Sequence, residues 1–147
     1  MKNAALLLAT LLLCLVFLFG CNKNEESFVY LSDPPTGGYL GEYDITNYER
    51  QIEQFPSEKN VGPITDADDA IEKGVLVLTE LYGAEEINDE KPFAAYYDPN
   101  SDTWLIKGSL PPAVRYSNGY SFVPMGGVAK IIINTSDGDV IAVWHEA

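Results

Sequence analysis

The stretch from Lys91 to Pro111 restricts the fold more than any other part of the sequence, because it predicts an aromatic β-hairpin. Asp98-Pro99-Asn100 supplies a turn in its middle, since proline presets φ for the second turn position and Asp98 can accept a local backbone hydrogen bond. A hairpin of this kind must bury one face against another element. Strand alternation places these residues on that face: Phe93, Ala95, Tyr97, Trp104, Ile106 and Gly108.

The element that could cover this face is a helix beginning near Thr65. Thr65 is a favourable N-cap, and Asp68 three residues later completes a capping-box pattern. Gly83 stands where helices commonly end. Gly74 costs about 1 kcal/mol relative to alanine inside a helix, which predicts that the helix approaches a sheet closely there. One apolar face runs along the helix: Ala67, Ala70, Ile71, Gly74, Val75, Leu78, Leu81 and Tyr82.

A second hairpin is predicted at the end of the chain. Val128 to Asn134 is rich in β-branched residues, Ser136 to Asp139 is a turn in which Asp137-Gly138 suits positive φ, and Val140 to Trp144 is the final strand. We therefore expect an α+β fold in which the helix packs across a curved antiparallel sheet of four or more strands. Before this second hairpin, Arg115 to Pro124 is expected to form a polar and aromatic loop, and Gly83 to Pro92 a connector.

The first 60 residues give weaker signals. Phe28 to Leu31 favours a short strand and Asp33 to Gly38 a loop, while Ile45 to Phe55 has near-helical apolar spacing that Pro56 ends. No definite structure is predicted for residues 28–60 as a whole. The expected organisation is a signal peptide at 1–20, a polar tether at 21–27, this N-terminal segment at 28–60, and an α+β domain at 61–147.

The extreme N-terminus predicts a lipoprotein. A short basic start precedes an apolar run from Ala4 to Phe19, which is too short for a typical membrane span and fits a signal peptide. Gly20 before Cys21 has the form of a lipoprotein cleavage box, so Cys21 is the predicted lipidation site. The alternatives are an ordinary secretory signal or an uncleaved anchor. Lipidation would place the protein in the cell envelope as a lipid-anchored membrane protein, and Asn22 favours the outer membrane if the host has two membranes.

Composition narrows the classes of partner. Without the predicted signal peptide, the balance is 8 basic against 22 acidic residues, or −14. This charge argues against nucleic acid as a ligand and permits a basic protein partner, although an acidic surface also serves solubility alone. Only Cys14 and Cys21 are present, so the predicted domain has neither a disulfide nor a thiol nucleophile.

No catalytic, metal or cofactor site is predicted. His145 is the only histidine, which disfavours zinc, and acid–base chemistry with Glu146 or Asp139 is the minor alternative to a strand-end histidine. Ser109 and Ser117 lack the context of a nucleophile elbow, and Gly126-Gly127 lacks that of a phosphate loop. Acidic residues that could bind calcium lack the spacing of an EF-hand and are interpreted as turn formers: Asp98, Asp102, Asp137 and Asp139.

An aromatic cluster in the loop before Pro124 is the candidate partner-binding site. Tyr116, Tyr120 and Phe122 lie close together around a glycine, and aromatic residues are enriched at the centres of interfaces. Packing of these side chains over the edge of the sheet is the alternative.

From about Gly62 to the end, the sequence resembles bacterial immunity proteins with a nuclear-transport-factor-2-like, or cystatin-like, fold. The resemblance covers about three-fifths of the chain and depends on the order of several short motifs. After an Asp- and Ala-rich helix start these are Leu81-Tyr82-Gly83, Lys91-Pro92-Phe93, Trp104 with Gly108-Ser109-Leu110-Pro111, Gly126-Gly127-Val128, and Gly138 with Val140.

The resemblance implies a function that composition and spacing do not provide. Immunity proteins of this kind protect the producing cell by binding a cognate toxin, and they are not enzymes. Other members of the wider fold are enzymes with a cone-shaped polar pocket, so a small-ligand binder or enzyme is the alternative, with His145, Tyr96 or Tyr97 near that pocket.

Overall fold

The two predicted hairpins supply four strands of a five-stranded sheet. The computed structural model describes residues 27–146, so the predicted signal peptide, the lipidation site Cys21 and most of the tether lie outside the described residues. The sheet has the order β2-β3-β4-β7-β8, and every neighbouring pair is antiparallel except β2 and β3, which are parallel. Its strands are β2 (Gly38–Glu42), β3 (Ala94–Asp98), β4 (Thr103–Lys107), β7 (Ala129–Asn134) and β8 (Val140–His145).

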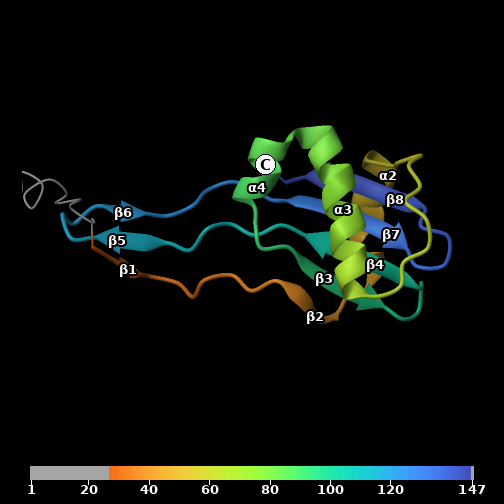
Figure 1. Ribbon diagram of the computed structural model, residues 1–147, viewed down its shortest axis with the longest axis horizontal. Coiled ribbons are helices and arrows are strands. Elements are labelled where there is room, and N and C mark those ends of the chain that lie inside the picture. Colours follow the sequence, from red (N-terminus) through yellow and green to blue (C-terminus); the bar gives the residue numbers. More distant parts are fainter. Residues whose placement is uncertain (1–26, 147) are drawn as a thin grey trace, which may run out of the picture.

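Helix α3 (Ala67–Tyr82) crosses one face of this sheet, as the sequence predicted (Figure 1). Tyr97 lies opposite Trp104 and Ala95 opposite Ile106, so the first hairpin presents one apolar face to the helix. The core between them is filled by apolar side chains from the helix and three strands. Its fully buried members include Leu78, Ile106, Ile131, Ile133 and Val140, with Phe93 buried and Trp104 partly buried beside them.

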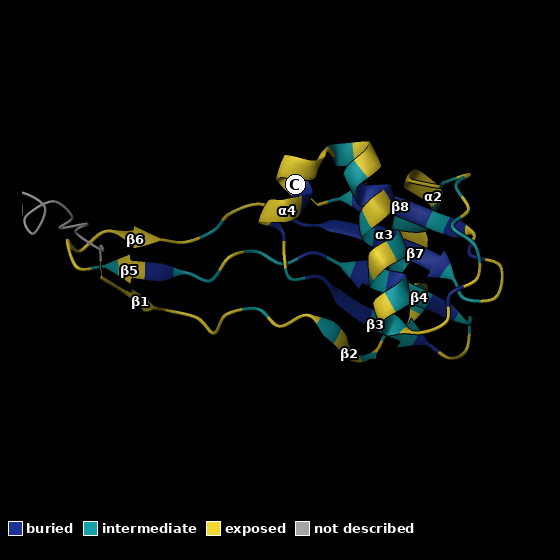
Figure 2. Ribbon diagram, viewed as in Figure 1, coloured by how far each residue is buried: buried dark blue, intermediate teal, exposed yellow. Residues whose placement is uncertain are grey.

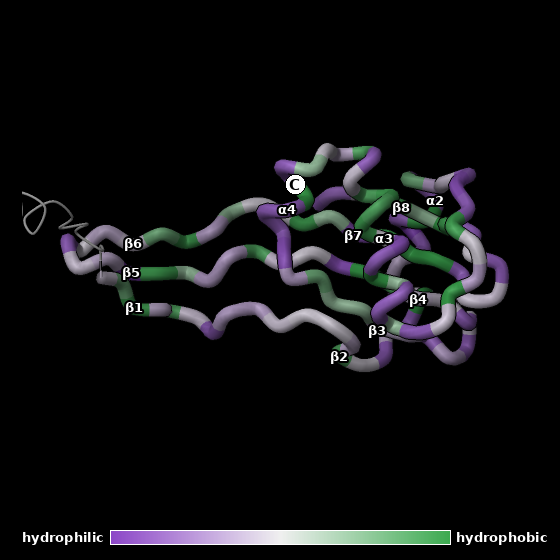
Figure 3. The backbone as a smooth tube through the Cα atoms, in the orientation of Figure 1, coloured by the Kyte–Doolittle hydropathy of each residue, from purple (hydrophilic) through white to green (hydrophobic). Residues whose placement is uncertain are grey.

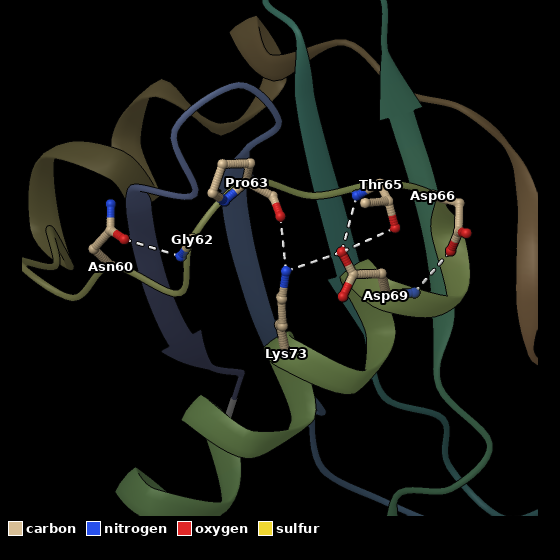
Figure 4. A network of polar contacts seen from close by, with 7 residues as sticks. All are labelled: Asn60, Gly62, Pro63, Thr65, Asp66, Asp69 and Lys73. Carbon is tan, nitrogen blue, oxygen red and sulfur yellow. Dashed lines mark hydrogen bonds and ion pairs between the residues drawn. The ribbon is translucent and has the colours of Figure 1, made fainter.

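The start of α3 is displaced by one residue from the prediction. The N-cap is Asp66, not Thr65: its carboxylate accepts a hydrogen bond from the Asp69 backbone at 2.9 Å. Asp69, rather than Asp68, reaches back and accepts bonds from the backbone and hydroxyl of Thr65 (Figure 4). Lys73 pairs with Asp69 at 3.0 Å and donates to the carbonyl of Pro63. A carboxylate caps more strongly here because it also opposes the positive end of the helix dipole.

Gly74 lies where α3 approaches the sheet, which confirms the reason predicted for a glycine inside the helix. A β-carbon at this position would stand 3.2 Å from side-chain carbons of both Ile106 and Ile131. These distances are shorter than ordinary van der Waals contact, so the absence of a side chain sets how near the helix can come.

The opposite face of the sheet is also covered, which the sequence did not predict. The 3-10 helix η1 (Ile45–Tyr48) and helix α2 (Glu49–Gln54) fall within the helix predicted from Ile45 to Phe55, and they lie on this second face. Tyr43, Ile45, Tyr48 and Ile52 pack there against buried side chains of the three strands β4, β7 and β8: Leu105, Ile132, Ala142 and Trp144.

Because both faces of the sheet are covered, even the charged residue Lys130 of β7 is buried. It projects to the side of the sheet opposite Ile131 and is buried there, close to the rings of Tyr48 and Trp144. Its ammonium group forms an ion pair with Glu146. Because both faces are covered, the whole run from Ala129 to Ile133 is buried.

Two further differences concern predicted loops. The connector between Gly83 and Pro92 contains the short helix α4 (Ala84–Asp89), whose Ile87 is buried in the core. The predicted loop from Arg115 to Pro124 is instead part of a hairpin of strands β5 (Val114–Tyr116) and β6 (Ser121–Phe122). Together with β1 (Phe28–Tyr30), these strands form a separate three-stranded sheet of order β1-β5-β6.

Candidate functional site

The small sheet is the end of an arm that projects from the rest of the molecule (Figure 1). We define the arm as residues 27–36 and 112–127, and the remaining described residues, 37–111 and 128–146, as the body. Beyond the three strands, the arm consists of extended segments that connect β1 to β2, β4 to β5 and β6 to β7. The end of the described chain at Ser27 lies at the tip of the arm, far from the body.

The register of the arm gathers its aromatic residues on one face. Phe28 lies opposite Tyr116, Tyr30 opposite Val114, and Val114 opposite Phe122. Residues directly opposite each other share a face of an antiparallel sheet. Tyr120 precedes Phe122 by two residues, and its carbonyl accepts a hydrogen bond from the backbone of Tyr116, which extends the pairing toward the turn. We call Phe28, Tyr30, Tyr116, Tyr120 and Phe122 the aromatic face.

Much of this apolar surface is exposed to solvent (Figures 2 and 3). Tyr120 is 76% exposed, and Phe28, Tyr30 and Phe122 are each close to half exposed. Val123 and Met125 follow β6 and are also exposed, Met125 by 91%. Phe28 makes edge contacts with Tyr30 and Tyr116, so the rings are arranged by one another and not by a covering element. A cluster of exposed apolar side chains on a projecting sheet is typical of an interaction surface.

The three residues predicted from the sequence as a candidate partner-binding site therefore come together. Tyr116, Tyr120 and Phe122 share one face of the arm and do not pack over the edge of the main sheet. Sequence reasoning missed Phe28 and Tyr30, although it predicted a short strand there. The alternation of aromatic residues in Phe28-Val29-Tyr30 was the available signal, but the partner strand lies more than 80 residues away.

Charge separates the arm from the body. The arm contains a single acidic residue, Asp33, and a single basic residue, Arg115, so its formal net charge is zero. The body contains 19 acidic and six basic residues, a formal balance of −13. The two parts of the molecule therefore present different chemistry, one neutral and aromatic and the other strongly acidic.

A second cluster lies where α4 meets the end of β8. Nε2 of His145 is 2.6 Å from a carboxylate oxygen of Glu90 and 3.6 Å from one of Glu86, and Nδ1 is 2.7 Å from the carbonyl oxygen of Glu146. The ring of His145 also makes an edge contact with Tyr82. The other oxygen of Glu90 accepts a hydrogen bond from the backbone of Ala129 at 2.7 Å.

This cluster has the residue types of a metal site, since ligand atoms of Glu86, Glu90 and His145 all lie within 4.8 Å of one another. Each polar atom of His145 and Glu90 already has a protein partner, however, so an ion pair accounts for the arrangement. The acid–base partners considered for His145 are placed elsewhere. The carboxylate of Glu146 pairs with Lys130, and Asp139 accepts a hydrogen bond from Asn60.

The ion pair between His145 and Glu90, at the end of α4, is expected to make the stability of the protein depend on pH. Burial lowers the pKa of His145, but the hydrogen bonds to Glu90 and to the Glu146 carbonyl, together with the charges of Glu90 and Glu86, raise it above its usual value. A raised folded-state pKa contributes stability that is fully present below the unfolded pKa near 6.5 and is lost as pH rises through the folded pKa.

We therefore expect His145→Gln to destabilise the protein more at about pH 5.5 than at about pH 8.5. Urea unfolding of both proteins at each pH measures this difference, and the comparison removes the contribution of other titrating groups. An equal loss at both pH values would mean that the imidazolium charge does not stabilise the folded state.

The acidic residues considered as calcium ligands accept hydrogen bonds from other groups of the protein, some in the same turn and some in distant segments. Asp98 accepts from the backbones of Ile45 and Asn100, Asp102 from the hydroxyls of Tyr97 and Ser136, and Asp137 from the backbone of Asp139. Their interpretation as turn formers is consistent with these bonds. Tyr97 contributes to one of these turns and stacks on Trp104, so its side chain does not line an internal pocket.

The interior of the fold has little space for a substrate. The region between α3 and the sheet, where a cone-shaped pocket would lie, is occupied by the fully buried Leu78, Ile106, Ile131 and Ile133. The cleft beside His145 has a volume of about 420 Å³ and opens to the surface. Ser109 lines that cleft, but its hydroxyl donates to the carbonyl of Pro92 at 2.7 Å.

A comparison with models of protein families gives a match. A family model described as NTF2 fold immunity protein matches residues 70–147, which is more than half of the chain. The matched region begins inside α3 and includes α4, the hairpin β5–β6 of the arm and the four strands from β3 to β8 of the main sheet. Comparisons with curated proteins and with solved structures gave no significant match.

Proposed function

Because the chain belongs to the family of NTF2 fold immunity proteins, we propose that it is a membrane-anchored lipoprotein that binds and neutralises a cognate bacterial toxin. The family match is the observation that carries this proposal. The filled core supports it from the structural side. Because the core between α3 and the sheet is filled in the part of the chain that the structure describes, the protein would act through its surface, by occluding a toxin.

The proposed anchor is a lipid on Cys21. The apolar run that ends at Gly20-Cys21 supports it, and it would place the protein in the cell envelope, in the outer membrane of a host with two membranes. No helix among the described residues is long and apolar enough to cross a membrane. A protein in the envelope can bind a toxin that acts there, or one that is crossing the envelope during entry. It would not meet a nuclease that is already in the cytoplasm.

The acidic body suits a toxin with a basic surface. With 19 acidic and six basic residues, the body would attract such a partner and speed its association. Nothing in this charge favours a nucleic acid or an anionic lipid as the ligand of the body.

Complex formation tests the proposal directly. We expect the protein to form a stable complex with the toxin encoded beside its gene, when the two are co-expressed and purified through a tag on the toxin. The affinity should fall as salt is raised, because exposed charges contribute to association. The absence of both a complex and protection of toxin-expressing cells would contradict the proposed neutralisation.

The anchor needs a separate control. Cys21→Ser is expected to leave complex formation in solution unchanged while abolishing the incorporation of radiolabelled fatty acid into the protein. If the variant still incorporates the labelled fatty acid, the lipid is not attached to this cysteine. The two outcomes therefore test toxin binding and lipid anchoring independently.

A further inference from the structure

The position of the arm relative to the predicted anchor restricts how the protein can lie on a membrane. Cys21 is six residues before Ser27, the end of the described chain, which is at the tip of the arm (Figure 1). Six extended residues span at most about 21 Å. A lipid on Cys21 would therefore hold the tip of the arm close to the bilayer, while the body could lie farther away.

The side chains at the arm suit that position. Tyrosine and phenylalanine combine a large apolar surface with low conformational freedom, and tyrosine is enriched at membrane–water interfaces because its hydroxyl can remain hydrated. Tyr120 and Phe122 belong to the aromatic face, and Val123 and Met125 continue the exposed apolar surface beyond β6. These residues come from the hairpin, and Phe28 and Tyr30 from β1 complete the surface beside the point where the chain enters the arm.

The distribution of charge also favours an orientation in which the arm, and not the body, faces the membrane. Anionic lipid surfaces repel acidic proteins, and this repulsion acts on the body, which has a balance of −13. The arm has no net charge, so it can approach the surface without this cost. If the arm lies at the membrane and the body away from it, the apolar side chains of the arm can contact lipid and the acidic body avoids electrostatic repulsion.

We propose that the arm contacts the phospholipid bilayer through its aromatic face, as a second attachment beside the lipid, and holds the acidic body away from the membrane. This inference rests on the lipid anchor proposed above. The body, including α2, α3 and the main sheet, then remains free for the toxin.

Site-specific spin labels can test this contact because the chain provides a favourable background. The thiol of Cys21 is consumed by lipidation and Cys14 lies in the predicted signal peptide, so an introduced cysteine would be the only free thiol. We choose Tyr120→Cys on the aromatic face, Met125→Cys beside it, and the matched control Glu53→Cys on the exposed surface of α2. The second arm position guards against loss of contact caused by removing Tyr120 itself.

The lipidated proteins are reconstituted in vesicles of phosphatidylethanolamine and phosphatidylglycerol, and the accessibility of each label to oxygen and to a water-soluble nickel chelate is measured. For the labels at residues 120 and 125, we expect the accessibility to the nickel chelate to be severalfold lower in vesicles than in soluble protein without the lipid. Their accessibility to oxygen should be higher in vesicles. The accessibility of the label at residue 53 to either reagent should be the same in both preparations.

Three other results would overturn the inference, and they differ from one another. Vesicle-bound protein with all three labels equally accessible to nickel would show that the arm lies in water although the anchor is present. Arm labels that are shielded only when the toxin is added would assign the aromatic face to the toxin instead. A protein that incorporates no fatty acid would lack the lipid anchor, and this result is known before any spin label is measured.

Discussion

Replacing Asp98 with alanine is expected to lower the free energy of unfolding by about 2–4 kcal/mol, because it removes a buried acceptor from three partly buried hydrogen bonds. Asp98 is 1% exposed at the end of β3. Its carboxylate accepts from the backbone of Ile45 at 3.0 Å and from the backbone of Asn100 and the hydroxyl of Ser101 at 2.9 Å. The residue therefore joins η1 to the turn of the first hairpin. Urea unfolding monitored by tryptophan fluorescence measures the loss.

A matched control is Asp44→Ala. Asp44 accepts comparable bonds from the backbone and hydroxyl of Thr46, but these bonds are exposed, so water can replace the carboxylate. We expect a loss of about 1 kcal/mol, as for other capping residues. Equal losses for the two variants would contradict the role assigned to burial at Asp98.

The same carboxylate should make stability depend on pH. The hydrogen bond from the backbone of Ile45 is the main cause that lowers the pKa of Asp98; burial opposes it, and the bonds from Asn100 and Ser101 add to it. A lowered folded-state pKa contributes stability above the unfolded pKa near 3.9, and this contribution is lost as pH falls through the folded pKa. Below about pH 4, the difference in stability between wild type and Asp98→Ala should therefore shrink.

Replacing Gly74 with valine is the second change for which we expect a large effect, a loss of about 2–3 kcal/mol or more. The new β-carbon would stand 3.2 Å from Ile106 and Ile131, and the two methyl groups attached to it would need further space in a filled core. Gly74→Ala should have a much smaller net effect, because the gain in helix propensity, about 1 kcal/mol, opposes the tight contact. Thermal and urea unfolding of the two variants give the comparison.

The control for this series is Glu72→Val, at an exposed position of the same helix. It introduces the same β-branched side chain where no strand lies beneath it, so we expect a loss below about 0.7 kcal/mol from helix propensity alone. If Gly74→Val were no more destabilising than Glu72→Val, the close approach of α3 to the sheet would not limit the side chain at residue 74.

The candidate site could be predicted only in part. Tyr116, Tyr120 and Phe122 are close in sequence, so their clustering was visible, but their local pattern indicated a loop. Strands β5 and β6 contain three and two residues, too few for a periodic signal, and their pairing with β1 depends on contacts between residues more than 80 positions apart. The pair of His145 and Glu90 was missed for the same reason, since 55 positions separate the two residues.

The sequence by itself determined the elements whose signals lie within one turn or one strand. These are helix α3 with its glycine at the close approach, the hairpin turn at Asp98, the turn at Gly138, and the family resemblance from about Gly62 onward. Local spacing and backbone preference are sufficient for such elements because the interacting residues are neighbours in the chain.

Only the tertiary structure decided how residues 28–60 are used. β2 extends the main sheet in parallel with β3, η1 and α2 cover its second face, and β1 joins the arm. Each of these contacts closes a loop of more than 40 residues, and its geometry depends on which surfaces remain uncovered once the hairpins and α3 have packed. The aromatic face of the neutral arm and its separation from the acidic body also depend on the tertiary structure. They are formed by segments that are far apart in the sequence and meet only when the chain is folded.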